Sequence, residues 1–209
     1  MTTPLPADAE TLFARLRDSL KDALGVSCNG QAQEGPDALA GVDPTMPVGE
    51  SAAGSGAEAA QAGSAEAPAF IGIHTGGAWL AARLHAELGL SSPLGFLSSA
   101  FYRDDVQARG LSTRMQPTRI DFDVNGRDIV LVDDILHTGR TIRAALNEIF
   151  DYGRPARVRL AVLIDRGGRE LPVQPDHVGA RLVLQPGEKL ALSQRTNGMF
   201  ELRVESVQA

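Results

Sequence analysis

Residues 129–141 read IVLVDDILHTGRT and constrain the fold more than any other part of the sequence. Four apolar residues, typical of a buried strand, lead into two adjacent aspartates and a short loop. A helical pattern follows, with one apolar face formed by Ile142, Ala145, Leu146 and Ile149. The next run, RVRLAVLI at 157–164, alternates as a strand does. Strand, helix and strand in this order form a right-handed parallel unit, so the sequence predicts an α/β fold with a mostly parallel central sheet flanked by helices.

The segments before and after this unit extend the same pattern. Residues 8–24 predict an amphipathic helix, and a strand at 69–73, a glycine turn at 74–77 and a helix at 78–88 predict a further parallel unit. Shorter strand-like runs are expected at 95–103, at 114–124 and beyond Pro172. In such folds, small-molecule ligands sit at the carboxyl ends of the strands.

Residues 28–68 differ in composition from both flanks. Ala, Gly, Ser and Pro make up more than half of this segment, and it has no aromatic residue. It holds six acidic residues and no Lys or Arg, so it accounts for the whole net charge of −6. Such a composition cannot offset its ordering entropy by burial. We therefore expect a disordered acidic insertion at 28–68, between an N-terminal helical segment at 1–27 and a core with C-terminal strands at 69–209.

Cysteine usage and hydropathy exclude several classes of protein. The single cysteine, Cys28, rules out an intramolecular disulfide and argues against a metal–thiolate cluster. The sequence has no apolar run long enough to span a bilayer, and its first residues lack the layout of a signal peptide. We expect a soluble cytoplasmic protein that does not contact membranes.

Asp133 and Asp134 fall where an α/β fold places its chemistry, at the end of the strand. The loop beyond them opens a helix, whose free backbone N–H groups and dipole favour a bound phosphate. Gly139 permits close backbone approach, and Thr138 and Thr141 supply hydroxyl groups. The carboxylates are suited instead to accept hydrogen bonds from ribose hydroxyls. Together these features predict a ribose 5-phosphate site. The alternatives are a plain structural turn and the metal-binding strand of nucleotide hydrolases, but the chain has no GxxxxGK[ST] loop.

VLVDDILHTGRT resembles the 5-phosphoribosyl-1-pyrophosphate (PRPP) motif of type I phosphoribosyltransferases. Three longer blocks resemble the PyrR family: FYRDD at 101–105, PTRIDFDVNGRDIVLVDDILHTGRTIRAAL at 117–146 and DYGRPARVRLAVLIDRGGRELPVQPDHVG at 151–179. Members of this family are pyrimidine-operon attenuation regulators and also uracil phosphoribosyltransferases. The insertion at 28–68 is foreign to the family pattern. The resemblance implies a type I phosphoribosyltransferase-like fold with a small hood and a flexible lid, and an enzyme that converts uracil and PRPP to UMP and pyrophosphate.

The resemblance also implies roles for particular residues. Asp133 and Asp134 would hold the ribose hydroxyls and place negative charge beneath the developing cation, and Arg103 would close over the pyrophosphate. The 5-phosphate would be wrapped by the loop His137, Thr138, Gly139, Arg140 and Thr141. For His137 we expect the backbone N–H to matter more than the ring. Mg²⁺ would be held through PRPP, with no firm protein ligand.

Two further loops complete the expected site. Thr75, Gly76 and Gly77 occupy the position of the pyrophosphate loop, where the family has an arginine in place of Gly76. Asp165 and Arg166 would contribute to the base pocket, while Arg169 and Glu170 are equally well explained as a surface ion pair. Gly168 stands where the family pattern has histidine, a second departure near the site.

A reading from another class also remains: an RNA-binding transcription attenuator that senses UMP or PRPP, with weak or no catalysis. Its partner would be an mRNA leader, and the candidate basic residues are Arg15, Arg17, Lys21, Arg154, Arg157 and Arg159. The sequence shows no obvious aromatic platform for stacking bases. The family resemblance further implies a homodimer or a higher homo-oligomer.

Overall fold

A computed structural model describes residues 3–26, 67–98 and 116–206. Two predicted features lie outside these ranges, namely nearly all of the 28–68 insertion and the segment that contains Arg103. The described residues belong to one compact unit. Within them, no helix is long and apolar enough to cross a membrane.

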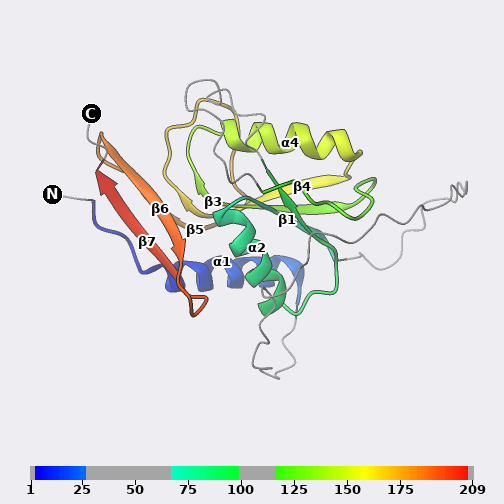
Figure 1. The fold of residues 1–209 in the computed structure, drawn as a ribbon, viewed down its shortest axis with the longest axis horizontal. Coiled ribbons are helices and arrows are strands. Elements are labelled where there is room, and N and C mark those ends of the chain that lie inside the picture. The colour runs from blue at the N-terminus through cyan, green and yellow to red at the C-terminus, as the bar shows by residue number, and fades with distance from the viewer. Residues whose placement is uncertain (1–2, 27–66, 99–115, 207–209) are drawn as a thin grey trace, which may run out of the picture. The chain divides into compact units, whose positions relative to one another are not determined.

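A five-stranded parallel sheet forms the centre of this unit, with the strand order β2-β1-β3-β4-β5 (Figure 1). Its strands are β1 (Ala69–Ile73), β2 (Leu94–Leu97), β3 (Asp128–Leu136), β4 (Arg157–Asp165) and β5 (His177–Arg181). The motif strand β3 is central, and its pairing with β4 runs from Asp128 beside Arg157 to Leu136 beside Asp165. The predicted parallel α/β fold is confirmed.

Helices cover both faces of the sheet (Figure 1). They are α1 (Ala9–Leu24) and α2 (Gly76–Glu87) on one face and α4 (Arg140–Tyr152) on the other. Successive strand residues point to opposite faces, so Val130 and Val132 pack toward α1 and α2 while Ile129 and Leu131 pack toward α4. A strand buried on both sides must be apolar at every position, which explains the continuous run IVLV.

Helix α1 forms as its leucine spacing predicts. Leu12, Leu16 and Leu20 are fully buried, and each stabilises the fold by about 1.5–3 kcal/mol relative to an exposed position. The Asp8 carboxylate accepts a hydrogen bond from the N–H of Thr11 at 2.9 Å and caps the first turn.

The C-terminal hairpin of β6 (Glu188–Gln194) and β7 (Phe200–Ser206) is antiparallel and packs against α1. The rings of Phe13 and Phe200 lie 5.4 Å apart, and the guanidinium of Arg83 on α2 lies 4.4 Å from the first and 5.1 Å from the second. Glu10 pairs with Arg83 and accepts from the N–H of Phe200 at 2.6 Å. The Glu10 carboxylate therefore connects α1, α2 and β7.

Two sequence predictions of secondary structure were wrong. The expected turn at 74–77 is shorter, because α2 already begins at Gly76. The strand-like run at 114–124 gives, among the described residues 116–124, only an isolated antiparallel bridge between Phe96 and Arg119. The two backbone hydrogen bonds of that bridge measure 2.8 and 2.7 Å, so the segment pairs with β2 at a single point.

Candidate functional site

Asp133 and Asp134 lie near the carboxyl end of β3, as the sequence predicts, but still inside the strand. Asp133 is only 6% exposed, whereas Asp134 is partly exposed. Each carboxylate accepts a hydrogen bond of 3.0 Å from the backbone N–H of the next residue. Because strand side chains alternate, the two carboxylates leave the strand on opposite sides. Asp134 is the one that faces α2.

The β1–α2 junction approaches β3 so closely that glycine is required. A β-carbon built on Gly77 would lie 2.4 Å from the carbonyl oxygen of Val132 and 2.9 Å from the Cα of Asp133. One built on Gly76 would lie 2.4 Å from Oδ2 of Asp134. The glycines predicted as a pyrophosphate loop are thus the first turn of α2, pressed against the two acids.

Residues on either side of these glycines anchor the junction. The backbone N–H of His74 donates to the carbonyl oxygen of Leu97 at 2.8 Å, and its ring lies 5.7 Å from that of Phe96. Burial lowers the pKa of His74 below 6.5, so its imidazole is neutral at pH 7. Thr75 is exposed and makes no side-chain capping bond to α2.

The predicted 5-phosphate loop connects β3 to α4. Gly139 is the N-cap of α4 with a φ of 90°, a left-handed conformation that favours glycine. Gly139 offers no side-chain cap, so the helix presents N–H donors at its first turn, which is a ready anion site. The Thr138 hydroxyl accepts from the N–H of Arg140 at 3.3 Å. Arg140 and Thr141 begin the helix itself.

The loop after β4 packs directly against the 5-phosphate loop. Backbone N–H groups of Glu170 and Leu171 donate to the carbonyl oxygen of Thr138 at 3.0 and 3.1 Å. The side chain of Glu170 pairs with Arg140 at 2.8 Å. The predicted Arg169–Glu170 pair is therefore wrong, because Glu170 takes Arg140 as its partner.

Arg169 holds these two loops together, a role that sequence reasoning missed. Its guanidinium donates to Asp165 at 2.6 Å, to the carbonyl oxygen of His137 at 2.6 Å and to that of Val173 at 2.9 Å. Asp165 is 9% exposed and also accepts from the N–H of Gly167 at 3.0 Å. The spacing of Asp165 and Arg169 was the one sequence signal for this pair.

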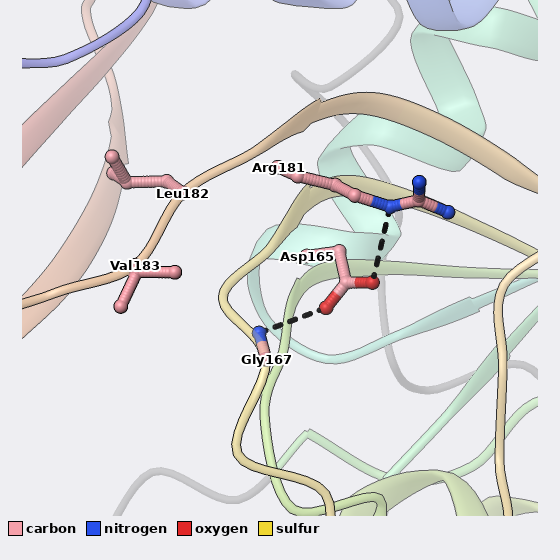
Figure 2. A pocket seen from close by; sticks show the side chains of 5 residues that line it. All are labelled: Asp165, Gly167, Arg181, Leu182 and Val183. Carbon is pink, nitrogen blue, oxygen red and sulfur yellow. Dashed lines mark hydrogen bonds and ion pairs between the residues drawn. The ribbon is translucent and has the colours of Figure 1, made fainter.

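A pocket opens on the β5 side of Asp165 (Figure 2). It is lined by Asp165, Gly167, Arg181, Leu182 and Val183. The Asp165 carboxylate lies 3.8 Å from Nε of Arg181, and its backbone carbonyl accepts from the N–H of Leu182 at 2.9 Å. Val183 is 80% exposed although it is apolar. The sequence pattern did not predict that Arg181, Leu182 and Val183 belong to this site. Their place at the end of a predicted strand was the only indication.

The remaining predicted residues are placed as follows. Arg166 is partly exposed, and its backbone N–H donates to the carbonyl oxygen of Leu136 at 3.0 Å, next to the 5-phosphate loop. Arg103 lies outside the described residues. Within the described ranges, no group of three or more His, Cys, Asp or Glu side chains is arranged to hold a metal ion. The carboxyl edge therefore brings together the acids, the two glycine-rich loops and the loop after β4.

Comparisons with known proteins agree with this geometry. The model of the phosphoribosyl transferase domain family matches residues 54–182. The chain is 57% identical over 128 residues to the Bifunctional protein PyrR of Nitrosococcus oceani, a match that covers 60% of this chain and 72% of the relative. It is 48% identical over 151 residues to the Bifunctional protein PyrR of Pseudomonas fluorescens, covering 72% of this chain and 89% of the relative.

A solved structure shows the same fold at low sequence identity. The hypoxanthine-guanine phosphoribosyltransferase of Bacillus anthracis is 15% identical and matches with a TM-score of 0.54. That match covers 91% of this chain and 88% of the other.

Proposed function

The chain belongs to the PyrR family and carries its phosphoribosyl transferase domain, and from this membership we propose that it transfers the phosphoribosyl group of PRPP to uracil. The products are UMP and pyrophosphate. The family resemblance predicted from the sequence is confirmed. One observation carries the substrate assignment, namely a central strand that carries two acids near its carboxyl end and leads through a short loop to a glycine-capped helix start.

The 5-phosphate of PRPP binds the loop between β3 and α4. Backbone N–H groups of the first turn of α4 and the hydroxyls of Thr138 and Thr141 donate to its oxygens. Arg140 and Glu170 already form an ion pair at this loop, so Glu170 moderates the positive charge that meets the phosphate. The ribose hydroxyls then lie within reach of Asp133 and Asp134.

The pyrophosphate binds at the start of α2, beside Thr75, Gly76 and Gly77. Because Gly76 has no side chain, this chain relies on backbone N–H groups and the helix dipole there, and not on a guanidinium. By the family resemblance, we propose that Arg103, which lies outside the described residues, contacts the pyrophosphate.

The difficult step is departure of pyrophosphate, which leaves positive charge on the ribose. We propose that Asp133 and Asp134 stabilise this charge near the carboxyl end of β3 and that the loops align the base with the anomeric carbon. Among the described residues no cluster of three or more ligands is arranged for a metal ion, which fits a Mg²⁺ ion that is held mainly through the phosphates of PRPP, with Asp133 and Asp134 as the nearby carboxylates. Such an ion would supply positive charge to the leaving pyrophosphate.

Uracil binds in the pocket beside Asp165, and we propose that Arg166, the next residue in the chain, contributes to base binding. This pocket follows β5 and adjoins the loop that contacts the 5-phosphate site, so base and ribose can be held at one edge of the sheet. The Leu182 N–H is already donated to the Asp165 carbonyl, so we propose that the backbone of Val183 pairs with the polar groups of a pyrimidine ring. The Asp165 carboxylate keeps the pocket wall in place through Gly167 and Arg169.

The test is product formation from PRPP, Mg²⁺ and single bases. We expect UMP from uracil, and no nucleotide from hypoxanthine, guanine or orotate. Asp133→Asn together with Asp134→Asn should abolish turnover while the melting temperature stays near that of the wild type. Nucleotide made from a purine alone, or full activity in the double variant, would contradict the proposal.

A second proposed function is regulation through RNA, since the family relatives are named bifunctional. The structure contributes one favourable feature. Phe150 and Tyr152 at the end of α4 are 42% and 46% exposed, and the Arg154 guanidinium lies 5.6 Å from the centre of the Phe150 ring. An exposed aromatic with an adjacent arginine is suited to stack a base of single-stranded RNA.

Two of the other basic candidates are less available. Arg17 pairs with Asp18 and Glu87, and Arg157 pairs with Asp128. RNA binding is tested by titrating the leader of the pyrimidine operon at two salt concentrations, with and without UMP. Affinity that falls steeply with salt and changes with UMP supports regulation. Affinity unaffected by both, or equal for an unrelated RNA, would exclude it.

We further propose that the chain forms a homodimer or a larger homo-oligomer. We also propose that it acts in the cytoplasm. Light scattering of the purified chain measures the mass, and a monomer at all concentrations would contradict the first part.

A further inference from the structure

The imidazole of His137 lies directly against Gly168. A β-carbon built on Gly168 would be 2.8 Å from Nε2 and 3.0 Å from Cδ2 of His137, closer than non-bonded atoms allow. His137 belongs to the loop after β3 and Gly168 to the loop after β4. The imidazole of His137 can therefore lie at this place only because Gly168 has no side chain.

The turn formed by Gly167 and Gly168 also contributes to a wall of the pocket. Gly167 lines the pocket and donates its N–H to Asp165, and Gly168 follows it with nearly the same φ, +68° against +69° (Figure 2 shows Gly167 and Asp165). His137 is tied to the same loop a second time, because its carbonyl oxygen accepts from Arg169 at 2.6 Å. Through ring and backbone, one residue of the 5-phosphate loop thus supports the loop of the pocket.

The charges around the ring favour its neutral form. His137 is an exposed residue, but partial desolvation of its ring against the loop is the main cause that lowers its pKa; the positive charges of Arg166 and Arg169 lower it further, and Glu170 opposes them. A neutral imidazole can rest against the loop at pH 7. Protonation would add a third positive charge beside the two arginines, and the repulsion would move the ring away from Gly168.

We propose that His137 is a positioning residue that couples the 5-phosphate loop to the base pocket. Its ring lies against Gly168 and thereby determines the position of the 167–168 turn at the pocket wall. The inference rests on the proposed function only in naming the ligand of each loop. It assigns to the ring of His137 a role that the sequence pattern had given to its backbone.

Binding of two ligands tests the coupling without requiring turnover. UMP reaches both loops, whereas ribose 5-phosphate reaches the 5-phosphate loop and lacks the base. In His137→Ala we expect the affinity for UMP to fall roughly tenfold, a size common for coupling between contacting groups, and the affinity for ribose 5-phosphate to stay within about twofold. Titration calorimetry of the full chain measures both.

Gly168→Ala provides an independent route to the same effect, because its new β-carbon displaces the ring. Gly198→Ala is the control, since Gly198 also has a positive φ, has nothing within 4 Å of the new β-carbon and lies between β6 and β7, outside the pocket lining. UMP affinity should fall roughly tenfold more in Gly168→Ala than in Gly198→Ala. In a His137→Ala background this difference should vanish, because no ring is left to displace.

A pH series separates the shape of the ring from its proton. In the wild type, UMP affinity relative to ribose 5-phosphate affinity should fall as the pH drops below 6.5, the ordinary imidazole value. His137→Phe keeps a flat ring that cannot titrate. At pH 7 its UMP affinity relative to ribose 5-phosphate affinity should equal that of the wild type, and this ratio should not fall at lower pH.

The outcomes distinguish this inference from the proposed function. A wild-type chain that binds neither UMP nor ribose 5-phosphate would overturn the proposed function. A wild-type chain that binds both, with an unchanged affinity ratio in His137→Ala, would overturn the coupling alone. An equal loss for the two ligands would also overturn it, because the ring would then serve the phosphate and not the pocket.

Discussion

Gly77→Ala is the substitution for which the structure predicts the clearest effect. The added β-carbon would lie 2.4 Å from the carbonyl oxygen of Val132, whose position is fixed by the sheet. Non-bonded heavy atoms prefer roughly 3.5 Å or more, so the start of α2 must retreat from β3 by about 1 Å. Retreat separates the proposed pyrophosphate loop from the two acids of β3.

The magnitude follows from two opposing contributions. Overpacking costs about 1–3 kcal/mol, and replacing glycine by alanine within a helix returns roughly 0.5–1 kcal/mol. The net loss is about 0–2.5 kcal/mol, which lowers the melting temperature of a chain of this size by up to roughly 10 °C. A misplacement of about 1 Å in a reacting site can reduce the rate by roughly a hundredfold. Calorimetry and kcat/KM for PRPP measure the two effects.

Gly76→Ala is the matched comparison on the same helix. Its β-carbon would meet the Asp134 side chain, with Oδ2 at 2.4 Å, and no backbone atom is among its three nearest neighbours. A side chain can rotate away more readily than a strand can move, so we expect a smaller change in melting temperature together with a clear loss of activity. A wild-type melting temperature and kcat/KM in Gly77→Ala would refute the reasoning from close contact.

Further predictions concern buried charges and the insertion. Burial raises the pKa of Glu148, so its stabilising neutral form is lost as the pH rises through the folded value; Glu148→Gln should raise the melting temperature at pH 8 and change it little at pH 4. Arg169→Ala should cost about 3 kcal/mol in urea unfolding because it strands a buried carboxylate, whereas Arg203→Ala, at an exposed pair, should cost less than about 1 kcal/mol. Burial lowers the pKa of His177, so the contribution of its neutral form to stability is fully present above pH 6.5 and is lost as the pH falls through the folded value; His177→Asn should reduce this loss of melting temperature at low pH. Deleting residues 30–66 should leave the melting temperature nearly unchanged, because the composition offers little apolar area to bury.

The parts of the site that the sequence predicts are those built from one continuous segment. An apolar strand, two acids and a glycine before a helix occur in order within residues 129–141, and the structure keeps that order. Burial on both faces forces β3 to be apolar throughout, so the strand is readable from composition alone. The same holds for α1, whose leucine spacing has only one structural explanation.

The parts that could not be predicted depend on segments far apart in the chain. Gly76 and Gly77 read as a turn, because glycine weakens helices, yet their place in α2 is decided by contact with β3. Arg169 reads as a surface charge next to Glu170, yet the fold brings it to Asp165 and to the backbone of His137. Local propensity contains no information on either approach, since both require the sheet order.

The contacts at the carboxyl edge also show why its charges should act as one unit. Arg140 is paired with Glu170 and Arg169 with Asp165, so two of the arginines beside the 5-phosphate loop are partly neutralised before any ligand binds. Backbone N–H groups and hydroxyls must therefore supply much of the attraction for the phosphate. The Arg140–Glu170 pair joins the loop after β3 to the loop after β4, and the Arg169–Asp165 pair braces the second loop against the end of β4. We therefore expect that a phosphate which draws Arg140 toward itself would release Glu170 and loosen the loop beside the proposed base pocket.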